Sequence, residues 1–310
     1  MQSLPLFPKF RRYALDDREW YNAFFKEFEP YADFSYGNLI VWLDQYDDLL
    51  ISRHEDNIIL SSTVLFMESE QIITLLGKSN IEATLDAIFA HQTSIGKEPV
   101  VSGVTAIVAQ NTEIQGSKKY IVESDRENFE YLYDTNFWAT LEGSEIRKLR
   151  REVNTFEKEF GQRSSVHPLD LTSADQAEEL KVVIASWSNT FSHNDVDRSE
   201  SLVLDRLFKL APQLPYKANG LYIDEKLEGF LIYQVLPQQT TACFSHVKAS
   251  YNYRYMFDYL LHKSAQIALN QGITQINFEQ DLGISGLRTH KESLKPKGFF
   301  EKFTIRPAVS

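Results

Sequence analysis

The sequence contains one cysteine, Cys243, among its 310 residues. A single cysteine excludes an intrachain disulfide and a metal site built from several thiolates, and it is typical of a reducing compartment. Long apolar runs are missing as well, since no stretch approaches the roughly 18 residues that span a bilayer. The N-terminal segment MQSLPLFPKFRRYALDD has neither the apolar core nor the cleavage site of a secretory signal. We therefore expect a cytoplasmic protein without a transmembrane segment.

Basic charge is also scarce, because 32 lysines and arginines stand against 43 aspartates and glutamates, a net charge of −11. Such a chain does not attract nucleic acid or anionic lipid through its overall field, so either partner requires a local basic patch. The GxSxG elbow of α/β-hydrolases and the GxxxxGK[ST] phosphate loop are both absent. The histidines show no HxxxH or comparable spacing, so we predict no metal site.

The order of the expected elements repeats along the chain. Hydrophobic residues make up 43% of the sequence, and its length suits two domains of about 150 residues. The first half predicts helices and strands at 20–28, 36–46, 49–64 (a hairpin), 71–77, 81–96 and 99–110. The second half predicts elements at 220–237 (a hairpin), 240–249, 251–272, 273–283 and 298–307. Because hairpin, strand, helix, strand occurs in both halves, we predict two similar domains at 1–136 and 137–310.

The clearest single helix is expected at 143–161, GSEIRKLRREVNTFEKEFG, with Gly161 at its end. Its apolar face is formed at helical spacing by Ile146, Leu149, Val153, Phe156 and Phe160. Elsewhere on the helix, Arg147, Arg150 and Arg151 are the best candidates in an acidic protein for contact with phosphate or RNA. The alternative is an ordinary solvent-exposed surface, because neighbouring glutamates dilute this charge.

The second half resembles the core of the GNAT (N-acetyltransferase) fold. The resemblance implies an α/β protein with mixed sheets, in two tandem GNAT-like domains. It also implies a gap between the strands at 240–249 and 273–283 that holds the pantetheine arm of an acyl-CoA. The pyrophosphate would then lie at the start of the next helix, where unpaired N–H groups and the helix dipole favour an anion. The family's glycine-rich turn is absent, and the matching positions hold the candidate cofactor-binding residues Lys248, Ser250, Asn252 and Arg254.

Those four residues, Lys248, Ser250, Asn252 and Arg254, either bind an anion or only cap the helix and lie on the surface.

A more specific resemblance follows at 276–296, INFEQDLGISGLRTHKESLKP, which is similar to the signature of the DUF2156 family. That family is related to the C-terminal catalytic part of phosphatidylglycerol lysyltransferases. The segments FSYGNLIVW at 34–42 and YLYDTNFWATLEGSEIRKLRREVNTF at 131–156 resemble two further family motifs. Phe278 stands where the family usually has Trp.

This resemblance implies transfer of an acyl or aminoacyl group from acyl-CoA or aminoacyl-tRNA to an amine or hydroxyl acceptor. The sequence favours neither donor. The chain lacks the membrane-spanning part of the lipid lysyltransferases, so a lipid acceptor does not follow from the resemblance, and the sequence does not support peripheral lipid contact.

Three residues are candidates for catalysis. Glu279 and Asp281 lie at the C-terminal end of a predicted buried strand, where a carboxylate can act as a general base if its surroundings raise its pKa. Asp281 alternatively caps the next helix or pairs with Arg288. His246 is either a proton shuttle or a hydrogen-bonded structural histidine. Arg288 and Lys291 share a helix face and either hold a phosphate of the donor or lie in solvent.

The leading hypothesis is a soluble acyl- or aminoacyltransferase. The missing glycines favour a rival, a catalytically silent GNAT-like module that binds a ligand or partner. A third possibility is an RNA-binding protein that uses the arginines of the helix at 143–161.

Overall fold

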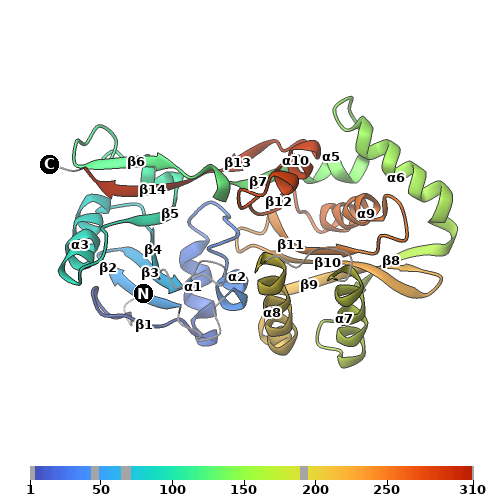
Figure 1. The fold of residues 1–310 in the computed structure, drawn as a ribbon, viewed down its shortest axis with the longest axis horizontal. Coiled ribbons are helices and arrows are strands. Elements are labelled where there is room, and N and C mark those ends of the chain that lie inside the picture. Colours follow the sequence, from blue (N-terminus) through green and yellow to red (C-terminus); the bar gives the residue numbers. More distant parts are fainter. Residues whose placement is uncertain (1–3, 43–48, 64–70, 189–194, 309–310) are drawn as a thin grey trace.

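Three β-sheets with helices packed on them form the computed structural model, which describes residues 4–42, 49–63, 71–188 and 195–308. The N-terminal half and the C-terminal half lie side by side (Figure 1). This arrangement confirms the mixed α/β class expected from the sequence. Within the described ranges, no helix combines the length and apolar character that crossing a membrane requires.

The N-terminal half is built on an antiparallel four-stranded sheet in the order β1-β2-β3-β4. The hairpin expected at 49–64 is confirmed, and its turn places Glu55 at φ 51°. The strands are β1 (Arg11–Arg12), β2 (Leu50–His54), β3 (Asn57–Thr63) and β4 (Gln71–Leu76). The helices are α1 (Arg18–Phe25), α2 (Tyr36–Val41) and α3 (Ile81–Ser94). The end of the helix expected at 36–46 lies outside the described residues.

The C-terminal half is built on a seven-stranded sheet in the order β13-β7-β12-β11-β10-β9-β8. The hairpin expected at 220–237 is confirmed, because Asp224 and Glu225 adopt the positive φ angles of a tight two-residue turn. The strands are β7 (Glu130–Asp134), β8 (Ser164–Leu169), β9 (Tyr216–Ile223), β10 (Lys226–Val235), β11 (Thr241–Ala249), β12 (Gln275–Asn277) and β13 (Gly298–Phe300).

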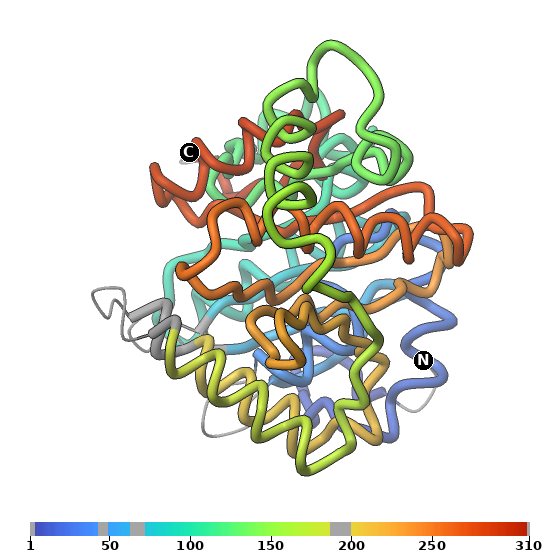
Figure 2. The backbone as a smooth tube through the Cα atoms, turned by 90° about the vertical axis from the view of Figure 1, so that its right-hand side faces the viewer, coloured from blue at the N-terminus to red at the C-terminus, as the bar shows by residue number. Residues whose placement is uncertain are grey.

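Helices cover both faces of this sheet and bury a separate apolar core on each (Figure 2). One face packs against α5 (Thr135–Thr140), α6 (Arg147–Phe160) and α9 (Met256–Asn270). The other face packs against α7 (Ala174–Ser188) and α8 (Asp195–Leu210). On α6 the apolar residues expected to face inward do so, since Leu149, Val153 and Phe156 are buried.

The two halves exchange strands across the predicted domain boundary. Strand β7 precedes residue 137 but completes the C-terminal sheet, where it pairs with β12 and β13. The last strand, β14 (Lys302–Pro307), returns to the N-terminal half and pairs with β5 (Val101–Thr105) and β6 (Tyr120–Ser124). The division at 136/137 stays a prediction, while the hydrogen-bonded sheets link the two halves across it.

Several expected element ends are wrong for local reasons. The strand expected at 99–110 ends at Thr105, and the short helix α4 (Ala106–Ala109) follows. The expected end of α6 is confirmed, since the helix ends at Phe160 with Gly161 as its C-cap, but Gly161 has φ −54° and opens a 3-10 turn. Helix α9 begins at Met256 instead of 251, because Tyr255 adopts φ 63°. The strand expected at 298–307 divides into β13 and β14.

Candidate functional site

A cavity of about 1000 Å³ lies where β11 and β12 separate. The two strands pair in parallel only between residues 241–243 and 275–277. Beyond these pairs, the cavity is lined by residues 278–280 and by Phe244, Ser245, Val247, Lys248 and Ala249. The gap implied by the GNAT resemblance is therefore present. The N-terminal half supplies another part of the wall, which includes Leu39, Trp42, Leu60 and Thr74.

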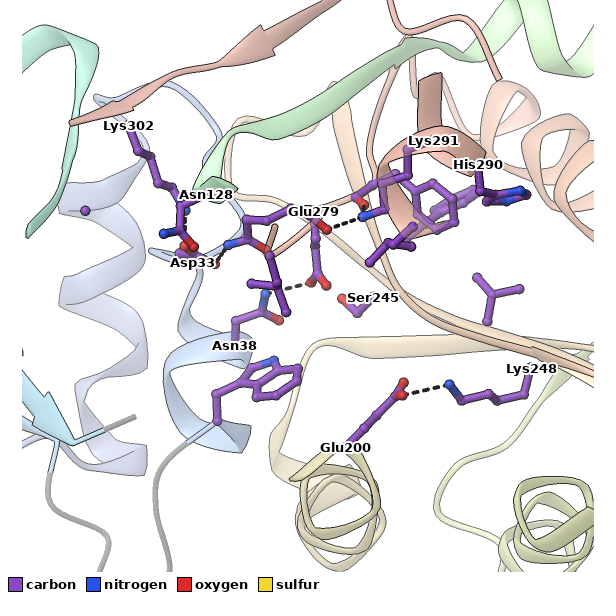
Figure 3. Close-up of a pocket in the computed structure, with 18 of the residues that line it drawn as sticks. Asp33, Asn38, Asn128, Glu200, Ser245, Lys248, Glu279, His290, Lys291 and Lys302 are labelled. Carbon is purple, nitrogen blue, oxygen red and sulfur yellow. Dashed lines mark hydrogen bonds and ion pairs between the residues drawn. The ribbon is translucent and has the colours of Figure 1, made fainter. Parts of the chain in front are cut away.

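Glu279, a predicted catalytic residue, lines this cavity (Figure 3). It lies in the loop after β12, because the strand expected at 273–283 ends at Asn277, and its φ of 55° is uncommon for a residue other than glycine. Its Oε1 atom accepts hydrogen bonds from Asn38 Nδ2 at 3.0 Å and from the Cys243 thiol at 3.3 Å. Burial, reinforced by the charge of Glu279, raises the pKa of Cys243, so the thiol stays protonated and donates.

Lys291 brings a cation to the cavity wall from helix α10 (Ser285–Ser293). It is buried, and its Nζ donates to the main-chain carbonyls of Phe278 and Gln280. Burial lowers the pKa of Lys291 to about 8, although the negative charge of Glu279 acts in the opposite direction. Lys291 therefore fastens α10 to the loop that carries Glu279, rather than lying in solvent.

Asp281 is buried, and donors surround its carboxylate. Arg288 binds it through two hydrogen bonds of 2.9 and 2.8 Å, and Arg126, Tyr131 and the Gly283 amide donate at 3.0, 2.7 and 2.9 Å. Burial acts to raise the pKa of Asp281, but the bonds from Arg288 and Tyr131 outweigh it and the pKa falls to about 2. The general-base role predicted for Asp281 does not fit this geometry. The alternative role of Asp281, an ion pair with Arg288, is present. Arg288, which was predicted to hold a phosphate of the donor, is therefore already bound to Asp281.

His246 is buried and bonded to a residue that sequence reasoning missed. Its Nδ1 lies 3.0 Å from Glu200, whose other oxygen lies 2.7 Å from Lys248 Nζ. Burial acts to raise the pKa of Glu200, but the charges of Lys248 and His246 prevail and lower it to about 2. His246 thus has the hydrogen-bonded structural position that was its alternative, while Lys248 lines the cavity. Nothing in the sequence of α8 distinguishes Glu200.

The turn before α9 differs from an anion-binding loop. Ser250 accepts a hydrogen bond from the Asn252 amide at 3.3 Å, and the Arg254 guanidinium lies 4.3 Å from the centre of the Tyr255 ring. Ser250 and Arg254 line the cavity, whereas Asn252 is exposed outside it. The first turn of α9 carries Asp258, whose pKa is raised to about 6 by burial and by the charge of Glu152.

The arginines predicted to contact phosphate lie at the start of α6, away from the divergence of β11 and β12. Arg147 and Arg151 are exposed. Arg150 has a structural task, because its guanidinium donates to the carbonyls of Leu141, at 2.7 Å, and Gly143.

A second buried cluster, which no sequence pattern marks, joins the halves at the far side of the cavity. Lys302 Nζ lies 2.9 Å from Glu130 Oε1 and also pairs with Asp33, and Asn277 donates to Glu130. Burial raises the pKa of Glu130 to about 8 and lowers that of Lys302. The cluster anchors β14 of the N-terminal half to β7 and β12 of the C-terminal sheet.

Comparison with known proteins places this geometry among related folds. A family model for the C-terminal part of phosphatidylglycerol lysyltransferase matches residues 25–306. An uncharacterised protein of Mycoplasmoides gallisepticum is 24% identical over 190 residues, which are 61% of this chain and 59% of that protein. The matched region thus spans less than two thirds of that relative.

Solved structures resemble nearly the whole chain. A conserved protein of unknown function from Bacteroides thetaiotaomicron has a TM-score of 0.81 and 22% identity, over 96% of this chain and 98% of the other. L-PGS from Bacillus licheniformis has a TM-score of 0.63 and 17% identity, over 95% and 93%. A tandem GNAT protein from the clavulanic acid biosynthesis pathway has a TM-score of 0.50 and 8% identity, over 97% and 99%. These likenesses confirm the expected GNAT-like fold.

Proposed function

The chain belongs to the family of phosphatidylglycerol lysyltransferase C-terminal domains, as its motifs predicted, and on this premise we propose that it transfers an acyl or aminoacyl group to an amine or hydroxyl acceptor. One observation carries the proposal: Glu279 lines a large cavity at the divergence of two parallel strands. Ligands of α/β sheets bind at such carboxyl ends of strands. The separation of β11 from β12 leaves room there for the reacting groups.

In this proposal Glu279 acts as the general base. Asn38 and Cys243 both donate to Oε1, and among the described residues no donor bonds to Oε2. Oε2 takes the proton from the acceptor as the acceptor's nitrogen or oxygen bonds to the carbonyl carbon of the donor. The bond from that carbon to the leaving oxygen or sulfur then breaks, and the proton passes to the leaving group. The Lys291 ammonium adds positive charge beside the developing oxyanion.

We propose aminoacyl-tRNA rather than acyl-CoA as the donor. The CoA pyrophosphate of GNAT-like enzymes lies at the start of the helix that corresponds to α9, and here Asp258 places a half-buried carboxylate in that turn. A pyrophosphate there would meet like charge, and the turn lacks the glycines that allow close approach. In contrast, Arg147, Arg151 and Lys158 are exposed on α6 and suit the phosphates of an RNA.

A transfer assay tests this proposal. The protein is incubated with tRNA charged with radiolabelled lysine, or with radiolabelled acetyl-CoA, together with hydroxylamine or phosphatidylglycerol vesicles as acceptor. We expect label to leave the tRNA faster than in the absence of protein, and no acetyl transfer. RNA binding should weaken steeply with salt. If neither donor loses its label and neither raises the melting temperature, the proposal is wrong and a silent binding module accounts for the fold.

A further inference from the structure

The side chain of Asn38 is fixed in one orientation by a buried network. Its Oδ1 accepts hydrogen bonds from the Tyr216 hydroxyl at 2.6 Å and from Gln234 Nε2 at 2.8 Å. An amide oxygen only accepts, and an amide nitrogen only donates. Because both donors converge on Oδ1, the Nδ2 atom must face the other way, where Glu279 Oε1 lies at 3.0 Å.

The residues that fix Asn38 are themselves held in place. Gln234 Nε2 also donates to Ser35 Oγ at 2.9 Å. The same Ser35 Oγ accepts a hydrogen bond from the main-chain N–H of Asn38 at the start of α2. Gly37 lets α2 approach β10 closely, since a Cβ atom there would lie 2.6 Å from Gln234 Oε1. Ser35, Asn38 and Gln234 are each buried. The network therefore has little freedom to reorient.

We propose that Asn38 is a positioning residue that holds the Glu279 carboxylate for proton transfer. The inference rests on the base role of Glu279 in the proposed function. A glutamate on a loop has three side-chain torsions to restrain, and the other donor to Oε1 is the weakly donating thiol of Cys243. Since Nδ2 donates to Oε1, it holds that oxygen in place and leaves Oε2 as the oxygen that takes the proton.

Through Asn38 the N-terminal half contributes to positioning the base. Asn38 lies on α2, while Glu279 follows β12 of the C-terminal sheet, so the two residues are 241 positions apart. The base is therefore positioned correctly only when both halves are packed together. Tyr216 and Gln234, on β9 and β10, act on Glu279 through Asn38 rather than directly.

A double-mutant cycle tests the proposal with the full chain. Asn38→Asp keeps an oxygen that accepts from Tyr216 and Gln234. It replaces the Nδ2 donor to Glu279 with a carboxylate oxygen. We expect kcat to fall about 100-fold with KM changed less than threefold, the loss that a misplacement of about 1 Å produces. In a Glu279→Gln background the same substitution should change kcat less than threefold, because the group being positioned is gone. Asn136→Asp is the matched control and should leave kcat unchanged, since Asn136 is exposed on α5 and does not line the cavity.

Equal losses in both backgrounds would overturn the positioning role while leaving the base role intact. Full activity of Glu279→Gln alone would instead overturn the proposed function. If Asn38→Asp fails to fold, Tyr216→Phe carries the same cycle, because it removes one of the two donors that orient Asn38. It should lower kcat about tenfold in the wild-type background only, and an equal loss in both backgrounds would again contradict the proposal.

Discussion

Asp281 and Arg288 are joined by two hydrogen bonds of 2.9 and 2.8 Å, which tie the loop after β12 to helix α10. Arg126 and Tyr131 bind the same carboxylate from the segment around β7. The loop that presents Glu279 is thus fixed at its far end by a buried, fully bonded aspartate. The aspartate that resembles a catalytic residue in the sequence is instead a support for its neighbour.

Asp281→Asn should lower the free energy of unfolding by about 3 kcal/mol at pH 7, because it leaves two arginines without their buried partner. The wild-type pKa of about 2 lies below that of the unfolded chain, so this advantage is complete above pH 4 and is lost as the pH falls from 4 to 2. Urea unfolding at pH 7 and at pH 2.5 measures both effects. Glu292→Gln, at an exposed partner of Arg126, should change stability by less than about 0.5 kcal/mol.

Glu130 and Lys302 should be strongly coupled. Each single variant, Glu130→Gln or Lys302→Met, leaves the other buried side chain with fewer hydrogen-bonding partners and should cost about 1–3 kcal/mol. The double variant should cost clearly less than the sum of the two, because neither member of the pair remains. Chemical denaturation of the four proteins gives the coupling energy. If the losses in the free energy of unfolding are additive, the Glu130–Lys302 pair contributes no coupling energy between the two halves.

Gly37→Ala should destabilise the protein by about 1–3 kcal/mol, because the added methyl group displaces Gln234 from the network around Asn38. Gly286→Ala is the matched control within α10, where nothing lies within 4 Å of the new Cβ. Alanine there should stabilise by about 0.5–1 kcal/mol through its higher helix propensity. Melting temperatures of the two variants should therefore move in opposite directions.

Lys291 should make stability depend on pH in the alkaline range. Its folded pKa of about 8 lies below the ordinary 10.5, so the unfolded chain binds the proton more tightly between these values. The free-energy cost of burying the charged Lys291 side chain is therefore absent above pH 10.5 and is complete once the pH has fallen through 8. The stability of the wild type relative to Lys291→Met should therefore rise as the pH rises from 8 to 10.5. Exposed Lys297→Met serves as the control variant, and parallel urea titrations would compare the two variants with the wild type.

Local patterns predicted much of this fold. The hairpins at 49–64 and 220–237 follow from alternating apolar strands around polar turns, and the apolar face of α6 follows from helical spacing. The family motif at 276–296 identified the loop that lines the cavity. These features depend on residues close together in the sequence, and a single sequence contains that information.

The parts that sequence reasoning missed depend on contacts between distant segments. Asn38 meets Glu279 only because α2 packs against the C-terminal sheet, and Glu200 reaches His246 from a separate helix. Asp281 and Glu279 are equivalent carboxylates in the sequence, and only the positions of Arg126 and Arg288 separate a support from a candidate base. Strand β14 crosses to the other half because its pairing partners, β5 and β6, lie there.

The rate of a single turnover with Glu279→Gln tests the central claim most directly. Protein in excess over lysyl-tRNA is mixed with hydroxylamine, and the loss of label from the tRNA is followed for wild type, Glu279→Gln and the exposed control Glu142→Gln. Glu279→Gln keeps the shape of the side chain but cannot take a proton. It should slow transfer about 10²- to 10⁴-fold at unchanged donor affinity, while Glu142→Gln matches wild type. Wild-type transfer by Glu279→Gln would contradict the assignment of Glu279 as the base.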